Sequence, residues 1–585
     1  MRTDSRIITR LFLRLLPVQI LFVAISSINS VIDGIVASNI IGVHAMTAIG
    51  LFGPLMKFLE TLNLVLLSGS QILCGQFLGK RQLERTENIF SLDIFLVSSI
   101  AVLISLVCLL APTAIAAPLS GRGSDVKGLS DYIRGMSFGF LPTLLSSQLS
   151  AFLQLEQKQR RIYIGMGVMM AMNFILDIVF VRFLTMGLFG LGLSTSVSSI
   201  LFLIVLGSWH FGGRSMIRFS MHRIRWTDLP SIVRIGIPGA VCSLCLAFRG
   251  LAVNHILMQC SGDAGVAAMS AMNTYGYLLY AMTAGVASAT RLLVSVFYGE
   301  EDRTGLVLVM RTAIRKGVLL VVAVSCLVFA FSGILAGSFY NDQRSEVYRL
   351  TKDLFRIYSL AMPISAVCVI FSNCFQSISR MGMVHILSVV DGFFGVVLSG
   401  LVLCPFMGAY GIWWSLVLNN VYTSVIIVAH AHIRNRRFSL RIDDLIALPG
   451  SFGVPEDRRL DITIHSKEEV TDTSRLVMDF CRDQGIDRRR SYYAGLCLEE
   501  MASNIVEHGF DGKGSHSIDV RVVHKDDDLL LRIKDDCRAF NPEEKMRLLD
   551  PEDITHNIGL RMVHGLAKET FYSNVLGLNI FTMTI

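Results

Sequence analysis

Two stretches of sequence decide the fold: "MGLFGLGLS" at residues 186–194 and "MGAYGIWWS" at residues 407–415. They begin 221 residues apart, since 407 − 186 = 221. Two proline pairs keep the same offset: Pro17 with Pro238, and Pro142 with Pro363. The same offset at three positions predicts that the chain contains two copies of one structural unit, one after the other. The two copies are predicted to have the same orientation in space.

The composition is that of a membrane protein joined to a soluble part. Of 585 residues, 52% are hydrophobic and only 17% are charged, against roughly 25% in ordinary soluble domains. Apolar stretches long enough to cross ~30 Å of hydrocarbon recur to about residue 432, and twelve spans are predicted in two six-span repeats, about 11–210 and 232–432. The spans lie near 11–40, 46–72, 88–117, 131–155, 161–184, 187–210, 234–260, 265–298, 304–337, 348–378, 383–404 and 408–432.

Basic residues gather in alternate loops. Examples are "KRQLER" at 80–85, "EQKQRR" at 156–161, "RSMIRFSMHRIRW" at 214–226 and "RNRRFSLR" at 434–441. Because basic loops stay on the cytoplasmic side, we expect a multi-pass protein of the cell membrane with both termini cytoplasmic. The net charge of +7 is explained by this topology, so no nucleic acid partner is expected; membrane lipid surrounds the spans.

A few polar residues lie inside the predicted spans, where charge is unfavourable and therefore marks candidate functional sites. Asp33 lies in span 1, and Asn173 and Asp177 lie one helical turn apart in span 5. Asn254 is the repeat equivalent of Asp33, and Arg249 lies mid-span nearby. These residues are candidates for a transport site, since a buried carboxylate can exchange a proton near neutral pH and the substrate site of such duplicated transporters lies between the halves. The alternative is that they only hydrogen-bond neighbouring helices.

Residues 1 to about 435 resemble the MATE family of multidrug and toxin extrusion transporters. The resemblance is carried by "IDGIVASNIIG", "SGSQILCGQFLGKRQ" and "NFILD", together with the twelve-span duplication. It implies export of small organic, often cationic, compounds coupled to inward H⁺ or Na⁺ flow. It also implies a cation site at Asp33, Asn173 and Asp177.

Arg249 departs from what a cation exporter needs. It either pairs with a membrane carboxylate such as Asp391 or Glu60, or it lies in the cavity and favours an anionic or zwitterionic substrate. An unpaired charge in the membrane is strongly unfavourable, which favours the first interpretation.

The composition changes after the last span. Residues 433–457 form a linker with Pro and Gly, and residues 458–585 form a polar domain. "RLDITIHS" is predicted as a strand, 468–484 and 491–508 as helices, "HSIDVRVVHKDDDLLLRIKDD" as a hairpin and "LNIFTMTI" as a final strand. "HNIGLRMVHGLAKETF" is predicted to open a further helix. The pattern indicates a soluble α+β sandwich, an antiparallel sheet backed by helices.

The second of these helices carries a polar stripe. Glu500, Asn504 and His508 recur every four residues and so share one face. An amide oxygen can hold Mg²⁺ on a bound phosphate, and a carboxylate can accept a proton from an attacking hydroxyl. A solvated polar face is the alternative.

Three further motifs follow in order: "IKDDCRAFNP" at 533–542, "HNIGLRMV" at 556–563 and "GLNIF" at 577–581. With the stripe they resemble the GHKL ATP-binding fold, and most closely its anti-sigma-factor serine kinase branch. The resemblance covers about 458–585.

This resemblance assigns roles to named residues. Asn504 would hold the metal of Mg-ATP, Glu500 would be the catalytic base, and Asp535 would bind the adenine amino group. Gly559 would meet the phosphates at a helix start. Asn557 stands where the phosphate loop normally has its first glycine.

Cys537 is a second departure, because it stands at a further glycine position of the motif. Weakened catalysis with retained nucleotide binding is the expectation, so serine or threonine kinase activity is left open.

The sequence therefore predicts an H⁺- or Na⁺-coupled antiporter regulated by a cytoplasmic nucleotide-binding domain. The energy source is an ion gradient because the chain has no P-loop. One alternative is a membrane-anchored serine kinase that acts on an anti-anti-sigma-like protein while its transporter fold senses a ligand. Another is a flippase for a lipid-linked substrate, which would fit Arg249.

Overall fold

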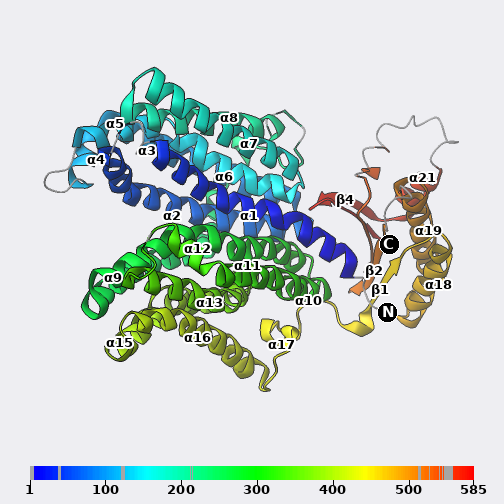
Figure 1. Cartoon of the computed structure of the whole chain (residues 1–585). Helices are drawn as coiled ribbons and strands as arrows, with labels where there is room; N and C mark the ends of the chain where they lie inside the picture. Colours follow the sequence, from blue (N-terminus) through cyan, green and yellow to red (C-terminus); the bar gives the residue numbers. More distant parts are fainter. Residues whose placement is uncertain are drawn as a thin grey trace.

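The structure is a computed structural model. It describes residues 5–36, 41, 43–119, 126–210, 212–213, 215–340, 342–510, 516–525, 528–538, 540–542, 545 and 558–585. A large helical bundle is followed by a small domain with one sheet, which lies against one end of the bundle (Figure 1). We call this the domain end of the bundle, and the opposite end the far end.

The first half of the bundle contains α1 to α8. Its helices are α1 (Ser5–Val36), α2 (Val43–Gly79), α3 (Leu83–Leu110), α4 (Pro112–Leu119), α5 (Val126–Ser137), α6 (Phe140–Leu155), α7 (Gln159–Asp177), η2 (Ile178–Phe183) and α8 (Gly187–His210). Two short 3-10 turns, η3 (Met221–Arg223) and η4 (Trp226–Asp228), lead into the second half.

The second half repeats this arrangement with α9 to α16. Its helices are α9 (Leu229–Gly299), α10 (Arg303–Thr312), η5 (Ala313–Gly317), α11 (Val318–Ala330), α12 (Ser332–Gly337), α13 (Glu346–Ser377), α14 (Met381–Val389), η6 (Val390–Phe394), α15 (Gly395–Met407) and α16 (Ala409–Asn435). The segments η2, η5 and η6 are π-helical.

The predicted number of spans agrees with the structure. The described residues include 11 helices long and apolar enough to cross a membrane, or 12 if α5 and α6, bent by 46° at their junction, form one span. Helix α9 covers two predicted spans and is broken at Gly262, where φ is 58° and ψ is −151°. Glycine adopts such a conformation most readily.

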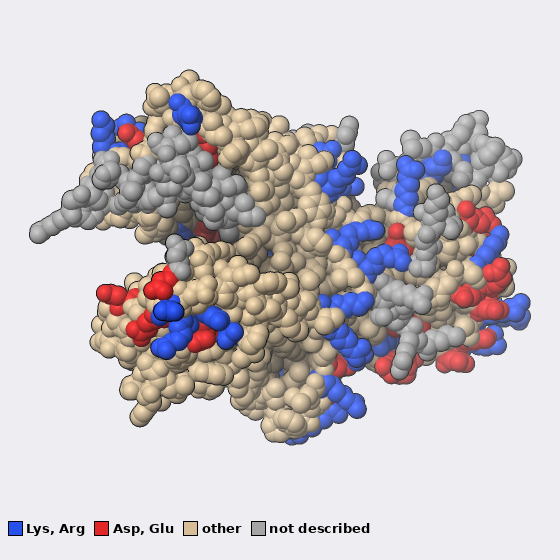
Figure 2. Space-filling model, viewed as in Figure 1, with Lys and Arg blue, Asp and Glu red and all other residues tan. Residues whose placement is uncertain are grey.

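The two halves approach each other closely where α2 and α9 end. A Cβ atom at Gly79 would lie 2.2 Å from the Val296 carbonyl oxygen, and one at Gly299 would lie 2.1 Å from the Gln76 carbonyl oxygen. Side chains at either position would separate the helices. At the far end, in contrast, the surface is hollowed between the halves (Figure 2). The bundle is thus closed at the domain end.

The C-terminal domain is an antiparallel sheet backed by helices, so the predicted fold class is confirmed. Helix α17 (Ile442–Ile446), in the predicted linker, packs against α16 and α10 of the bundle. The elements of the domain itself are η7 (Glu456–Arg458), β1 (Arg459–Ile464), α18 (Glu468–Asp483), α19 (Arg488–Gly509), β2 (Ile518–Lys525), β3 (Asp528–Asp535), α21 (Ile558–Leu566), β4 (Glu569–Val575) and β5 (Leu578–Thr584). The five strands lie in the order β1-β2-β3-β5-β4. Helix α21 ends at Leu566, so the end of the stretch predicted to open a helix belongs to β4 instead.

The two faces of the sheet have different partners. Alternate residues of β2, β3 and β5, such as Val520, Ile533 and Phe581, pack against α18 and α19. Because side chains alternate along a strand, the intervening residues face the bundle. Among them, Ile580 belongs to the same buried cluster as the core of the bundle. The sheet therefore lies between its own helices and the membrane part (Figure 1).

Candidate functional site

The polar pair predicted in span 5 is buried inside the first half of the bundle. Asn173 and Asp177 are both fully buried and face α8. The Ser194 hydroxyl donates to Oδ1 of Asp177, and Nδ2 of Asn173 donates to Oγ1 of Thr195 over 3.3 Å. Oδ1 of Asn173 is buried with no hydrogen-bond partner among the described residues. A carboxylate and an amide oxygen held this way can take a proton or a small cation.

Asp33 belongs to helix α1, which packs beside α7. Its side chain lies outside the described part of the structure. The geometry between Asp33 and the span 5 pair is therefore a prediction only.

The second half has no equivalent polar pair. The repeat offset places Phe394 and Leu398 at the positions of Asn173 and Asp177, since 173 + 221 = 394 and 177 + 221 = 398. Asn254, the equivalent of Asp33, is exposed and hydrogen-bonds to no described residue. The two halves share a fold but differ in intramembrane chemistry.

Arg249 lies beside Asp391. Its guanidinium donates to the main-chain carbonyl of Asp391 over 3.2 Å, while Nδ2 of Asn419 donates to Oδ1 of the same residue over 2.7 Å. The other predicted partner, Glu60, accepts from Lys57 over 3.2 Å. Sequence reasoning missed Asn419, although the rule that marks polar residues in apolar spans would have found it. Asp391 lies in the π-helical turn η6, a feature frequent at functional sites.

In the C-terminal domain, Asp535 closes strand β3 and is held by hydrogen bonds. Its Oδ1 accepts from Nδ2 of Asn579 and from the main-chain N–H of Cys537, over 2.8 and 2.9 Å. Burial raises the pKa of Asp535, against the opposing effect of these hydrogen bonds. The hydroxyl of Tyr572 donates to Oδ1 of Asn579 over 2.8 Å. These hydrogen bonds hold the motifs "IKDDCRAFNP" and "GLNIF" next to each other on one side of the predicted adenine site.

The predicted catalytic base lies against the predicted phosphate loop. A Cβ atom at Gly559 would lie 2.1 Å from Oε2 of Glu500, so α21 packs directly on that carboxylate. The side chain of Asn504, one turn further along α19, is partly exposed and bonds to no described residue. It remains accessible to a ligand. Asn557 lies outside the described residues.

The cysteine at the glycine position of the motif is tolerated. Cys537 is not among the residues with positive φ, so its backbone is one that any L-residue adopts. Its side chain is buried against Gly509, whose Cβ would lie 3.0 Å from the sulfur.

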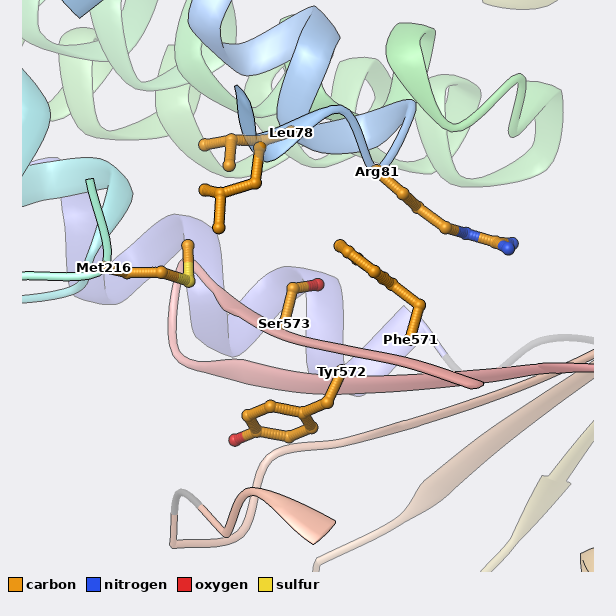
Figure 3. Close-up of a pocket in the computed structure, with 7 residues that line it drawn as sticks. Leu78, Arg81, Met216, Phe571, Tyr572 and Ser573 are labelled. Atoms are coloured by element: carbon orange, nitrogen blue, oxygen red, sulfur yellow. The ribbon is translucent and has the colours of Figure 1, made fainter. Parts of the chain in front are cut away.

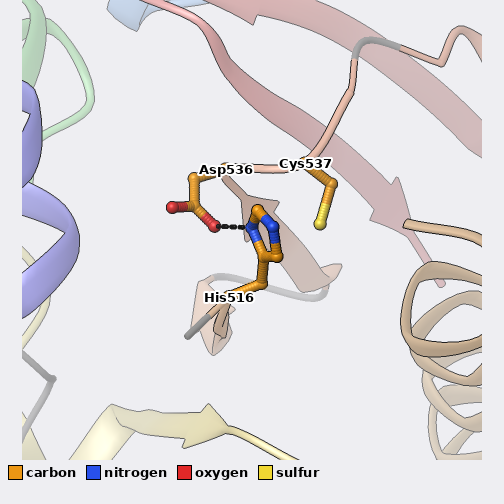
Figure 4. A group of neighbouring side chains, drawn as sticks. All are labelled: His516, Asp536 and Cys537. Carbon is orange, nitrogen blue, oxygen red and sulfur yellow. Dashed lines mark hydrogen bonds and ion pairs between the residues drawn. The ribbon is translucent and has the colours of Figure 1, made fainter. Parts of the chain in front are cut away.

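His516, Asp536 and Cys537 form a cluster of metal-ligand types (Figure 4). Their ligand atoms lie within 4.8 Å of one another, and Nδ1 of His516 lies 3.0 Å from Oδ1 of Asp536. However, Arg10 of helix α1 donates to Oδ2 of the same carboxylate. A guanidinium at this position opposes a bound cation, so the cluster joins the domain to the bundle.

A small pocket lies between the bundle and strand β4 (Figure 3). Its lining includes Leu78, Arg81 and Met216 from the bundle side. Phe571 points from the strand toward the bundle, whereas Tyr572 points to the opposite face of the sheet (Figure 3). Burial raises the pKa of Tyr572 to about 12, so its hydroxyl stays protonated and donates its hydrogen bond.

Sequence reasoning also missed a group of charged residues between the two parts. Glu300 and Asp302, in the loop between α9 and α10, form ion pairs with Arg521, Arg532 and Lys534 of the sheet. Charges in a short loop usually indicate a solvated surface, and the sequence contains no signal that pairs them across more than 200 residues.

Comparisons with known proteins agree with this division into two parts. Residues 19–180 and 238–401 match the MatE family. Residues 465–585 match the family described as Histidine kinase-like ATPase domain.

Similar proteins cover the membrane part. "Multidrug export protein MepA" of Staphylococcus aureus (strain COL) is 21% identical over 433 residues, which is 72% of this chain and 94% of that protein. A solved structure described as "Outward-facing conformation of a multidrug resistance MATE family transporter of the MOP superfamily" aligns with a TM-score of 0.66 and 20% identity, covering 73% of this chain and 96% of that chain. A MOP superfamily transporter from Pyrococcus furiosus, described by the reverse polarity of its binding pocket, aligns with a TM-score of 0.65 and 21% identity, covering 73% and 94%. These structural alignments show that the membrane part of the chain has the same fold as these transporters.

Proposed function

The chain belongs to the MatE family, and from this premise we propose that it is an H⁺- or Na⁺-coupled antiporter that exports small organic compounds and is regulated by nucleotide binding in its C-terminal domain. The observation that carries the proposal is the buried pair Asn173 and Asp177, which presents a carboxylate and an amide oxygen with no hydrogen-bond partner among the described residues. Burying such groups in a membrane is energetically unfavourable, so their presence marks a candidate functional site. The relative MepA is named a multidrug export protein, which supports organic substrates.

The ion site comprises Asp33, Asn173 and Asp177 in the first half. A proton or Na⁺ bound there would neutralise Asp177 and change its bond to Ser194, so ion binding would alter how α7 meets α8. Substrate would occupy the space between the halves, near Arg249 and Asn254. Arg249 lies beside Asp391 and donates to its main-chain carbonyl. A cation and a carboxylate side by side can bind the opposite charges of a zwitterion, so zwitterionic compounds fall within the proposed substrate class.

The C-terminal domain would lie on the cytoplasmic side of the cell membrane, together with both termini and the basic loops. Mg-ATP would be held by Asp535 at the adenine, by Asn504 at the metal and by the loop of Asn557 and Gly559 at the phosphates. The contact of Gly559 with Glu500 supports this arrangement, because it brings two of the predicted groups to one place. ATP would regulate transport, and the ion gradient would drive it.

A second candidate function is phosphotransfer to a serine of an anti-anti-sigma-like partner protein. The proximity of Glu500 to the helix that begins at Ile558 favours it, since a base beside the phosphate site is what such a kinase needs. A lipid-linked substrate has only Arg249 in its favour.

Efflux from proteoliposomes tests the transport proposal. We expect wild-type protein to move a fluorescent organic cation only with an imposed H⁺ or Na⁺ gradient, and Asp177→Asn to remove that gradient-driven flux while the protein stays folded. Asp131→Asn is the control, because Asp131 is a half-exposed residue of α5 whose neighbour is Arg134 at 3.9 Å. Gradient-driven efflux at the wild-type rate in Asp177→Asn would contradict the proposal.

A further inference from the structure

One acidic loop pairs with three cations on the bundle-facing side of the sheet, one of which, Arg521, also pairs with Asp461 of β1. Asp302 accepts from Arg521 over 2.8 Å and from Arg532 over 3.0 Å. Glu300 accepts from Arg532 over 2.8 Å and from Lys534 over 2.9 Å. Two carboxylates of the bundle thus hold three cations of the C-terminal domain.

These ion pairs are buried. The five side chains are between 5% and 12% exposed, and Nζ of Lys534 also lies 4.7 Å from the ring centre of Phe297. Burial alone would raise the pKa of Asp302, but Arg521, Arg532 and Lys534 outweigh it and hold that pKa below its ordinary range. Removing one side of a buried network leaves uncompensated charge and is strongly destabilising. The network therefore decides whether the domain lies against the bundle.

The same domain also binds the other half of the bundle. The main-chain N–H of Leu576 donates to the carbonyl of Leu155 over 2.8 Å, and Asp536 accepts from Arg10 of α1. Leu576 and Gly577, with φ of 56° and 73°, form the two-residue turn between β4 and β5. This turn sits on Gln157, because a Cβ at Gly577 would lie 1.5 Å from its Oε1. The sheet therefore touches both halves of the bundle.

Contact with both halves restricts how the bundle can move. The halves meet at Gly79 and Gly299, immediately before the loops beside the sheet. Further bonds cross the same seam: Arg291 donates to Gln71 over 3.0 Å, and Gln76 donates to the Ser377 carbonyl over 2.7 Å. If the bundle opens at this end, α2 and α9 must separate. A sheet of fixed shape cannot then keep Glu300 on one half and Leu155 on the other.

We propose that the C-terminal domain is a clamp: while Arg521, Arg532 and Lys534 hold the loop of Glu300 and Asp302, and the turn at Leu576 holds the other half, the bundle stays closed at the domain end. This inference rests on the proposed function and specifies the form that its regulation takes. Transport that exposes the substrate site alternately to the two sides of the membrane requires the bundle to open at the domain end. The clamp must therefore release either once in every transport cycle or for as long as the transporter is active.

The clamp and the nucleotide site share one strand end. Lys534 binds Glu300, Asp535 belongs to the predicted adenine site, and Asp536 binds Arg10. The three residues are consecutive, so the main chain cannot move at one without moving the others. A nucleotide can shift the clamp only by its difference in affinity for the held and released states. Asp535 is where that difference would arise.

The test measures opening at the domain end directly, in full-length protein in lipid nanodiscs. Spin-labelled non-natural residues replace Arg160 in the first half and Arg434 in the second half, and electron paramagnetic resonance gives the distance distribution between them. Glu300→Gln with Asp302→Asn removes the acidic side of the network. Asp479→Asn is the matched control, because Asp479 pairs with Arg482 over 2.9 Å on the exposed face of α18.

In nucleotide-free wild type and in the control we expect one distance population, that of the closed domain end. The double variant is expected to add a longer population, because loss of a buried network shifts such an equilibrium by on the order of 100-fold. Hydrogen exchange of residues 528–535 should rise in the same sample. A single unchanged population in the double variant overturns the clamp, and so does increased exchange without any longer distance.

A charge exchange keeps the test informative if the double variant is poorly folded. Glu300→Lys alone should lengthen the distance distribution, and Glu300→Lys with Lys534→Glu should shift it back toward wild type. Failure of the exchange to shift it back would overturn the clamp. The distances do not depend on transport. Lack of gradient-driven efflux in wild type would contradict the proposed function alone, whatever the distances show.

Discussion

Two loops of the bundle, Lys80–Gln82 and Glu300–Asp302, have the same backbone and opposite charge. Each follows an "F-x-G" sequence, and the two glycines are 220 residues apart, since 299 − 79 = 220. The second residue of each loop has positive φ, 62° at Arg81 and 53° at Glu301. The third donates its N–H five residues back, Gln82 to Phe77 over 2.9 Å and Asp302 to Phe297 over 3.0 Å.

This comparison shows what duplication preserved and what it did not. The backbone geometry and the glycine that allows close approach are common to both halves. The charge is not, and the acidic loop alone binds the basic strands β2 and β3. Arg81 of the basic loop lies near β4, where burial lowers its pKa to about 10 without removing its charge at neutral pH. The difference fixes one orientation of the C-terminal domain on a bundle with two similar halves.

The largest expected effect comes from giving the acidic loop the charge of the basic one. Glu300→Lys with Asp302→Lys places two cations against Arg521, Arg532 and Lys534. We expect the domain to leave the bundle, with an effect exceeding about 5 kcal/mol, since removing one partner of a buried pair already costs 3–5 kcal/mol. Hydrogen exchange across β2 and β3 in the full-length protein measures it.

The reciprocal change at the basic loop is the control. Lys80→Glu should weaken docking by far less, because Lys80 is exposed and forms no ion pair with the described part of the domain. Arg81 is left unchanged, because it interacts electrostatically with Glu569 of β4. Equal effects from both loops would show that net charge, and not the specific network, holds the domain.

The second expected effect concerns the turn that contacts the first half. Gly577→Ala introduces a side chain at positive φ and against Gln157. We expect the domain to lose about 1–3 kcal/mol of stability, since strained backbone conformations typically cost this much. Thermal unfolding monitored at the domain gives the difference. Adding Gln157→Ala should recover only the part caused by the clash, and full recovery would mean that backbone strain contributes nothing.

A third comparison is between the membrane parts of the halves. Leu398, at the repeat position of Asp177, is 55% exposed. Leu398→Asn should therefore leave gradient-driven efflux near wild type, with a stability loss of about 1 kcal/mol that is typical of single substitutions. Asp177→Asn should remove coupling. Loss of coupling in both variants would indicate that the second half also contributes to the ion site.

A fourth expected effect is a pH dependence from Asp519, which faces the bundle from β2. Burial raises its pKa to about 6, against a hydrogen bond of 2.8 Å donated by Thr463. Because this folded pKa exceeds the unfolded value of about 3.9, the contribution of Asp519 to stability is greatest below pH 4 and falls as the pH rises through 6. The loss is at most about 3 kcal/mol, since one pKa unit corresponds to about 1.4 kcal/mol.

Asp519→Asn should remove this dependence. Its stability relative to wild type should rise between pH 4.5 and pH 7.5, as measured by thermal unfolding of the full-length protein. A pH profile identical to that of wild type would show that Asp519 titrates normally.

Much of the fold follows from the sequence because its signals are local or periodic. Apolar length predicts the spans, the 221-residue offset predicts the two halves, and the four-residue spacing places Asn173 and Asp177 on one helix face. The short strand β4 was not predicted because "ETFYSNV" directly follows a helical pattern. Its strand state is set by pairing with β5, which is a tertiary effect.

The contact between the two parts could not be predicted in the same way. Glu300, Asp302 and Arg521 each have the sequence context of solvated charges, and only the three-dimensional arrangement buries them together. Asn419 differs, since an amide in an apolar span is a visible signal. The roles of Asp33 and Asn557 rest on the family resemblance, because the Asp33 side chain and all of Asn557 lie outside the described residues.

The most direct test of the whole account is nucleotide-dependent efflux in proteoliposomes whose C-terminal domains face the bath. With an ion gradient imposed, adding Mg-ATP or a non-hydrolysable analogue should change the efflux rate of wild type by several-fold. The same addition should leave Asn504→Ala unchanged, and without a gradient neither protein should transport. Efflux powered by ATP without a gradient, or a wild-type rate indifferent to both nucleotides, would contradict an ion-driven exporter regulated by its C-terminal domain.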